Sequence, residues 1–154
     1  MSIDTSIGEI LVTAVQSLTL MVTVAPLPAA SVIRSKTPSL PPGTHPPKIV
    51  VVVGDRPSKV EFISSAWKLS YWPCSIVIFA GDGAKQADDD RSRTWRAQIE
   101  AIIFDQQSSA FAGLASFNEV NASDKSAFDP AALDKDIAAL TSNFEVQVIE
   151  SRAG

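Results

Sequence analysis

The chain has 154 residues, of which 45% are apolar and 19% charged, and its formal net charge is −4. This composition is typical of one globular domain, which at this length buries enough surface to fold without a metal or a disulfide. The acidic balance argues against a nucleic-acid-binding protein, because such proteins usually carry a basic surface that displaces counterions from phosphates.

An uncharged stretch runs from Ile10 to Ile33 near the N-terminus. Polar residues interrupt it, and Pro26 and Pro28 break it, so the pattern does not favour a membrane span. No basic residue precedes Arg34, whereas a signal peptide begins with basic residues. We therefore expect no membrane partner and a buried helix followed by a proline-rich connection.

The first predicted element is a helix from about residue 5 to 20. Ser6 and Glu9 fit a capping box, with Asp4 as an alternative N-cap. Apolar residues recur at the spacing of one helix face: Ile7, Ile10, Leu11, Ala14 and Leu18.

A proline-rich loop is predicted at about residues 37–48, after a short strand within residues 31–36. Five prolines in this loop, Pro38, Pro41, Pro42, Pro46 and Pro47, prevent a helix or a central strand. Such a long loop is usually functional or ordered by a partner. It also holds His45, the only histidine, which we expect to be an exposed loop residue because no second histidine is available to it.

Two buried strands are predicted in the middle of the chain. Ile49–Val53 is apolar at every position, which is typical of a strand buried on both faces. Turn residues follow it, and residues 59–63 are expected to form a strand that pairs back on the first. Pro73 is expected to start the next strand, Cys74–Ala80, which would place the single cysteine in the core.

A long amphipathic helix should follow. Asp88, Asp89 and Asp90 suit its first turn, because acidic residues complement the positive end of the helix dipole. A core stripe follows at helical spacing: Trp95, Ile99, Ile102 and Ile103. Arg93 and Glu100 fall on the opposite face, and the helix should fray near residues 106–109.

The C-terminal part predicts two strands around a short helix. Residues 117–121 predict a short strand, and Asp129 with Pro130 predicts a helix over residues 130–140. Alternation over residues 144–150 predicts a half-buried antiparallel or edge strand. Together these elements predict a single α+β domain, in which an N-terminal helix and a central amphipathic helix pack on a mostly antiparallel sheet.

No catalytic or cofactor-binding motif emerges from the sequence. Gly54 stands alone after its strand, whereas a dinucleotide fingerprint needs three spaced glycines. The acidic residues from Asp82 to Asp90 do not have the spacing of a calcium loop. The sequence does not exclude a catalytic pair of carboxylates that are distant in the sequence and meet only in the folded chain. We expect a protein that is not an enzyme and needs no cofactor or metal.

The polar residues that gather in a pattern are candidates for an assembly surface. They are Asp82, Asp88, Asp89, Asp90, Arg91, Arg93 and Arg96. The planar guanidinium group suits ion pairs across an interface. Two alternatives remain open for these arginines. They are solvated or pair with the nearby aspartates of the same chain, or they pair with acidic residues of a neighbouring subunit.

The order of elements resembles the small neck and tail-completion proteins of long-tailed bacteriophages, in particular the tail terminator family. The resemblance lies in the N-terminal helix, the proline-rich connection, the strand Ile49–Val53, the strand Trp72–Phe79 with its helix W-R-A-Q-I at residues 95–99, and the late strand Phe144–Glu150. It covers most of the chain as a layout.

This resemblance implies a structural virion protein that is assembled in the host cytoplasm. Such a subunit forms a hexameric ring at the head-proximal end of the tail tube, stops tube growth and docks to the head connector, and DNA passes through without specific binding. The acidic chain agrees with such a conduit, because it repels DNA. Alternatives are a connector adaptor, a tube protein, or a small α/β enzyme or ligand-binding protein.

Overall fold

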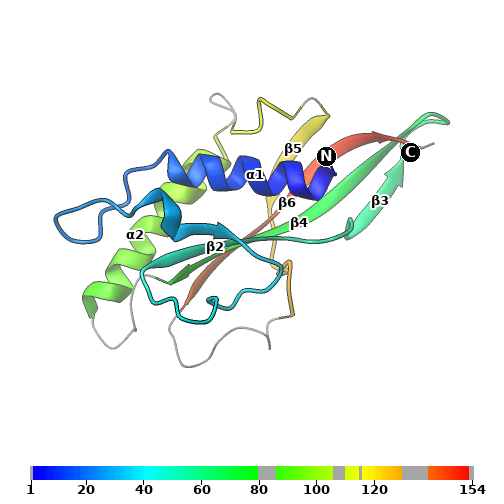
Figure 1. Ribbon diagram of the computed structural model, residues 1–154. Coiled ribbons are helices and arrows are strands. Elements are labelled where there is room, and N and C mark those ends of the chain that lie inside the picture. Colours follow the sequence, from blue (N-terminus) through cyan, green and yellow to red (C-terminus); the bar gives the residue numbers. More distant parts are fainter. Residues whose placement is uncertain (1, 80–85, 106–109, 115, 130–138, 153–154) are drawn as a thin grey trace.

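A computed structural model describes residues 2–79, 86–105, 110–114, 116–129 and 139–152 of the chain (Figure 1). The helices are α1 (Ile3–Gln16), a 3₁₀ turn η1 (Ala29–Ser31) and α2 (Gln86–Ile103). The strands are β1 (Val32–Arg34), β2 (Lys48–Val53), β3 (Lys59–Phe62), β4 (Trp67–Phe79), β5 (Phe117–Ala122) and β6 (Leu140–Ser151). They confirm the predicted α+β class.

The sheet has six strands and is mostly antiparallel. Its order is β1-β2-β4-β6-β5, with β1 parallel to β2 and every other pair antiparallel. The short strand β3 pairs with the first half of β4, beyond the end of β2. The long strands β4 and β6 pair over twelve positions, from Trp67↔Ser151 to Ile78↔Leu140, and form the centre of the sheet.

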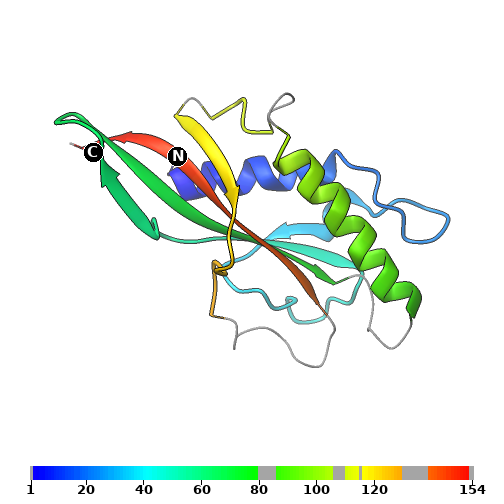
Figure 2. The same cartoon turned by 180° about the vertical axis from the view of Figure 1, so that it is seen from behind.

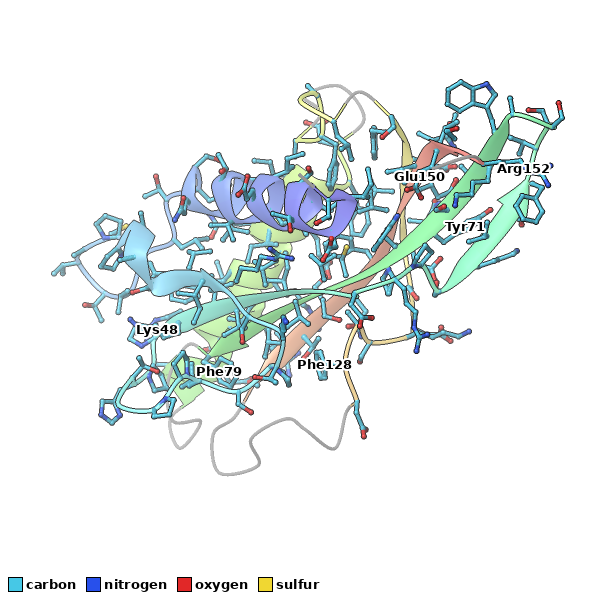
Figure 3. All side chains as sticks on the ribbon, turned by 45° about the vertical axis from the view of Figure 1, so that its right-hand side comes forward. Lys48, Tyr71, Phe79, Phe128, Glu150 and Arg152 are labelled. Carbon is cyan, nitrogen blue, oxygen red and sulfur yellow. The ribbon has the colours of Figure 1, made fainter. Side chains whose placement is uncertain are left out.

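Both faces of the sheet are covered where β2 lies. On one face, α1 and α2 pack on alternate strand residues and form the main core. Trp95, Ile99 and Ile103 of α2 are fully buried there, which confirms the predicted stripe. On the other face, a second cluster contains Phe79, with Leu40 of the proline-rich loop and Phe128 packed against it (Figure 3).

Helix α1 begins earlier than predicted. Its N-cap is Ser2, and Ser6 and Glu9 lie inside the helix, so the predicted capping box is wrong. The helix also ends at Gln16 rather than near residue 20, because Ser17 terminates it. The Ser17 hydroxyl donates to the Ala14 carbonyl (2.6 Å) and thereby satisfies one of the last carbonyl groups of the helix.

The turn between β2 and β3 led us to expect that these two strands pair with each other. Strand β3 pairs with β4 instead. Strand β4 is thirteen residues long and β2 only six, so one edge of β4 is long enough for two short neighbours. Strand β2 pairs with residues 74–79 of β4, and β3 pairs with residues 68–71. The expectation for residues 144–150 is confirmed in its antiparallel alternative, because β6 is half-buried and pairs antiparallel with β4 and with β5. It is not an edge strand, because it lies between these two strands.

Pro73 lies inside β4 rather than at the start of a strand. The Gly54 N–H donates to the Pro73 carbonyl (2.9 Å), so the backbone of Pro73 faces the edge that β2 and β3 share. At this position the partner of β4 changes from β3 to β2. A residue without an N–H is tolerated there, because β2 pairs with β4 only from Cys74 onward and β3 only up to Tyr71.

The remaining expectations concern the loops and the C-terminal part. The predicted strand at residues 117–121 is confirmed as β5. The predicted helix at residues 130–140 and the frayed end at residues 106–109 lie largely or wholly outside the described residues. The helix prediction is wrong at Leu140, which begins β6, and the proline-rich loop ends at Pro47 because Lys48 begins β2.

Candidate assembly surface

The charged residues of α2 make contacts within the helix. Arg93 Nε lies 3.0 Å from Asp89 Oδ2, one helical turn earlier, and this hydrogen bond raises the pKa of Arg93. Arg96 Nε lies 4.0 Å from Glu100 Oε1. Glu100, which was expected on the face opposite the core stripe, is partly exposed and accepts a hydrogen bond from the Ser142 hydroxyl of β6 (2.8 Å).

The structure describes some of the other candidate residues and not others. Asp90 and Arg91 lie in the first half of α2, where each has an interaction partner. Asp88 belongs to the same helix, but its side chain, like the whole of Asp82, lies outside the described part of the chain. Of the candidates whose side chains the structure describes, Asp89, Asp90, Arg91 and Arg93 lie in the first half of α2, and Arg96 lies in its second half. Arg93 pairs with an aspartate of its own chain.

The loop that follows α1 lies beside this end of α2. Trp95 Nε1 donates to the Met21 carbonyl (3.2 Å), which fixes the loop on the helix. A shallow hollow of about 520 Å³ separates the two segments, with Met21 and Val22 on one side and Arg91 and Thr94 on the other. Met21 is 44% exposed and Val24 is 94% exposed. We call residues 19–26 with the first half of α2 the loop end.

A hairpin projects from the opposite end of the molecule. It consists of β3, the turn at residues 63–66 and residues 67–71 of β4, and we call it the hairpin arm. Figures 1 and 2 show it beyond the part of the sheet that the helices cover, on the side away from the loop end. Its large apolar side chains are exposed: Val60 at 41%, Phe62 at 66%, Ile63 at 54% and Trp67 at 50%.

The residues before the C-terminus hold the tip of the arm in place. The Arg152 N–H donates to the Ala66 carbonyl (2.9 Å), and Arg152 Nη1 donates to the Ser64 carbonyl (2.8 Å). The same guanidinium group lies 4.0 Å from the centre of the Phe62 ring, a cation–π contact. Figure 3 shows Arg152 beside the arm. The exposed apolar residues are therefore carried by an ordered hairpin rather than by a loose loop.

Charged residues lie along one face of β3. Lys59 Nζ lies 2.6 Å from Glu61 Oε1 and 5.2 Å from the centre of the Tyr71 ring. The Lys59–Glu61 hydrogen bond lowers the pKa of Glu61 and raises that of Lys59. Loss of water around the Tyr71 hydroxyl, together with Glu61, raises the pKa of Tyr71. All three groups keep their ordinary charge states at neutral pH.

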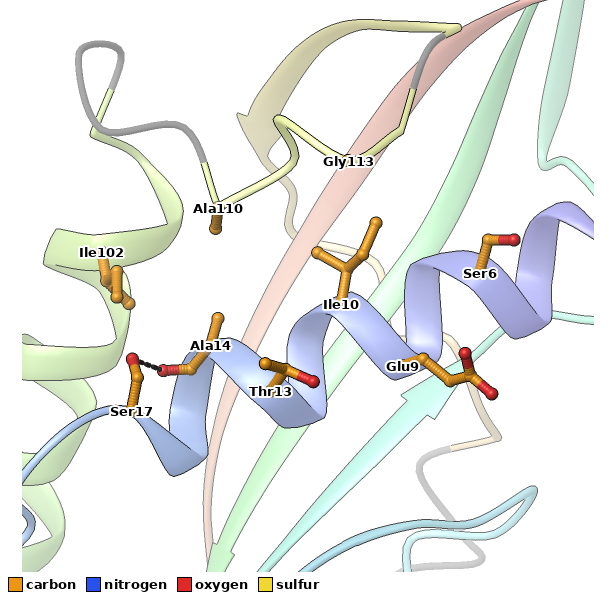
Figure 4. A pocket seen from close by; sticks show the side chains of 9 residues that line it. All are labelled: Ser6, Glu9, Ile10, Thr13, Ala14, Ser17, Ile102, Ala110 and Gly113. Carbon is orange, nitrogen blue, oxygen red and sulfur yellow. Dashed lines mark hydrogen bonds between the residues drawn. The ribbon is translucent and has the colours of Figure 1, made fainter.

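A second hollow of about 520 Å³ lies between α1, α2 and the segment at residues 110–113 (Figure 4). Ile10, Ala14 and Ile102 give it apolar walls, and Glu9 lies at its rim. The Ser17 hydroxyl in this hollow is bonded to the Ala14 carbonyl, as Figure 4 shows. Among the described residues that line it, Glu9 is the one carboxylate, and the remaining polar side chains are the hydroxyls of Ser6, Thr13 and Ser17.

Cys74 and His45 lie in different surroundings. Cys74 is fully buried, and burial raises the pKa of its thiol, which therefore stays protonated. His45 is exposed in the proline-rich loop. Within the described ranges, no three His, Cys, Asp or Glu side chains lie close enough together to hold a metal ion. No described helix has the length and apolarity that crossing a bilayer requires.

Sequence reasoning placed the candidate surface on α2 and missed the hairpin arm. Residues 59–63 were expected to pair with β2, which would have placed them in the body of the sheet. A signal was present in Phe62, Ile63 and Trp67, which are large apolar residues on both sides of a serine-rich turn. No protein-family profile, curated protein or solved structure matches the chain.

Proposed function

We propose that this chain is a structural subunit of a long-tailed bacteriophage, a tail terminator that forms a ring at the head-proximal end of the tail tube. The ring ends tube growth and offers a docking face to the head connector. The observation that carries the proposal is the pair of exposed apolar surfaces at opposite ends of the subunit, the hairpin arm and the loop end. The family resemblance of the layout supplies the biological setting.

Two unlike surfaces at opposite ends are what a ring subunit needs. A ring forms when one surface of each subunit binds a different surface of the next and the rotation closes. The arm presents Ile63 and Trp67 at its tip. The loop end presents Met21 and Val24 next to a hollow. We place the tip of one subunit on the loop end of the next, where aromatic and aliphatic side chains would be removed from water.

Two arginines of the loop end suit the same contact, although Asp90 also lines the hollow and Asp89 pairs with Arg93. Arg91 lines its hollow, and Arg93 lies on the exposed side of the same helix. Arginine and aromatic residues are enriched at protein interfaces, where the guanidinium group stacks on rings and forms forked hydrogen bonds. Trp67 of the incoming arm is a suitable partner for such stacking.

The proposal is tested by measuring the assembly state and the binding target of the purified protein. Native mass spectrometry and negative-stain microscopy should show closed rings, and electron microscopy should show the protein at the ends of preformed tail tubes. Incorporation along the tube would indicate a tube protein, and binding to the portal alone would indicate a connector adaptor. A strict monomer that binds neither would contradict the proposal.

Single substitutions test the head-to-tail contact. Val24→Asp and Trp67→Asp each place a charge in the proposed interface and should abolish rings, since an unpaired charge is costly to bury. Both side chains are at least half exposed in the subunit, so the fold should persist. Asn121→Asp, at an exposed position of β5, adds the same charge elsewhere and should leave the rings intact. Equal loss of rings in all three variants would contradict the assignment of the arm tip and the loop end as the ring interface.

A further inference from the structure

In the described part of the chain, the outer edge of β3 pairs with no other strand. The Ile63 N–H donates to the Trp67 carbonyl (3.2 Å), and this pair continues the register of β3 with β4. In an antiparallel ladder the residues alternate, so positions 59 and 61 turn their N–H and C=O groups toward β4, while Val60 and Phe62 turn theirs away. Among the described residues, no backbone hydrogen bond joins Val60 or Phe62 to a segment outside the sheet.

The side chains of this edge also alternate. Lys59 and Glu61 lie on one face of β3, and their side chains are 61% and 43% exposed. Val60 and Phe62 lie on the other face and are exposed as well. An exposed, apolar edge strand of this kind is a template for pairing with another strand.

We propose that β3 pairs antiparallel with β3 of a second copy of this chain, about a two-fold axis at Val60. In this register the outward backbone groups of the two Val60 residues bond to each other. Lys59 of each copy then lies directly opposite Glu61 of the other. These two residues form a non-hydrogen-bonded pair, the type in which opposite side chains lie closer together. The contact therefore contains two identical ion pairs, one on each side of the axis.

Charge selects this register over the neighbouring ones. Residues that turn their backbone outward must face one another, so the axis can lie at position 60, 61 or 62. With the axis at Glu61, two glutamates would lie directly opposite each other, which is destabilising. With the axis at Phe62, Glu61 would face the apolar Ile63. The pattern Lys-Val-Glu at positions 59–61 is thus self-complementary in one alignment.

This contact is separate from the proposed ring and does not depend on it. A two-fold axis joins like surfaces, whereas the ring joins the arm tip to the loop end. The tip residues Ile63 and Trp67 lie outside the paired segment of β3. The same chain can therefore form β3-paired dimers, or pairs of rings joined through their arms.

A charge-exchange experiment tests the pairing. Lys59→Glu places two carboxylates opposite each other on each side of the axis, and Glu61→Lys places two ammonium groups there. Each variant alone should weaken the β3-dependent dimer at least tenfold in sedimentation velocity, and an equimolar mixture of the two should recover it. The ion pair within each chain is lost in both variants and stays lost in the mixture, so recovery reports the contact between copies.

Three outcomes of this experiment would overturn the proposal. They are a wild-type chain that does not associate through β3 at high micromolar concentration, single variants that associate as the wild type does, and a mixture that does not recover. Unchanged circular dichroism spectra and melting temperatures serve as the folding control, because Lys59 and Glu61 are exposed in the subunit.

A crosslink tests the register independently. Residues at a hydrogen-bonded pair have Cα atoms about 5.5 Å apart, which a disulfide spans. Val60→Cys should therefore form a disulfide-linked dimer under mild oxidation. Phe62→Cys is the matched control, since the two copies of position 62 lie roughly 13 Å apart along the paired strands. The native Cys74 is fully buried and does not interfere. Equal crosslinking of both variants, or none with Val60→Cys, would exclude the register.

Discussion

At the scale of single residues, Gly54 and Pro73 determine how β4 passes from one neighbour to the next. Gly54 directly follows β2, and its N–H donates a hydrogen bond to the Pro73 carbonyl (2.9 Å). A Cβ atom on Gly54 would lie 2.6 Å from Pro73 Cγ and 3.2 Å from Pro73 Cδ. The glycine is therefore required because the proline ring occupies the space of a side chain, rather than because a ligand approaches, as in a phosphate-binding loop.

This close approach predicts the effect of Gly54→Ala. The added methyl group must displace the Pro73 ring, which is held in a paired strand, so we expect a loss of about 1–3 kcal/mol in the free energy of unfolding. Urea denaturation measures the loss. Gly113→Ala is the matched control, because a Cβ there meets no atom within 4 Å. A Gly54→Ala chain as stable as the control would show that the ring does not fill this space.

At the scale of elements, the sequence predicted the helices and strands that can be recognised from the apolar pattern of their own residues. Two such predictions were correct: the buried stripe of Trp95, Ile99 and Ile103, and the buried strand β2. Each follows from the spacing of apolar residues within a single helix or strand. The partner of β3 could not be predicted, because it depends on the length of β4. A proline near the middle of β4 hid that length, and only the arrangement of β2 and β3 explains why the proline is tolerated.

The candidate surface followed the same rule. The sequence suggested charged residues of α2 as candidates, since they are close together along one helix. It could not find the loop end as a surface, because residues 19–26 reach α2 only in the folded chain, where Trp95 bonds to Met21. It also missed the hairpin arm, whose exposure depends on β3 extending beyond the helices.

The arginines of α2 give a prediction for this element. Reversing both charges, with Arg93→Glu and Arg96→Glu, should impair ring assembly and leave the melting temperature of the subunit nearly unchanged. Arg93 is exposed, and ion pairs within an exposed helix contribute little to stability. Size-exclusion chromatography and thermal unfolding measure the two effects. Ala101→Glu, on the same helix and exposed, controls for the added negative charge. Normal rings from the double variant would exclude these arginines from the interface.

At the scale of the whole molecule, shape and charge point to the same use. The subunit is elongated, with the apolar arm at one end and the loop end at the other (Figure 1). Its 17 acidic residues outnumber its 13 Lys and Arg residues. In the proposed ring the apolar ends would lie in the contacts between subunits, and the net charge of −4 per subunit would oppose DNA binding, as a passage through which DNA slides requires.

The net charge predicts that the assembled protein does not retain duplex DNA. Binding without sequence preference comes from lysine and arginine residues that release counterions from phosphates, and it typically gives dissociation constants of about 10⁻⁴ to 10⁻⁶ M at physiological salt. Because the net charge is −4 per subunit, we expect that about 10 μM protein does not change the fluorescence anisotropy of a labelled duplex at physiological salt. A basic DNA-binding protein serves as the positive control. Saturable binding that weakens as salt is added would show that basic residues gather on one face of the ring, and it would contradict a passage that repels DNA.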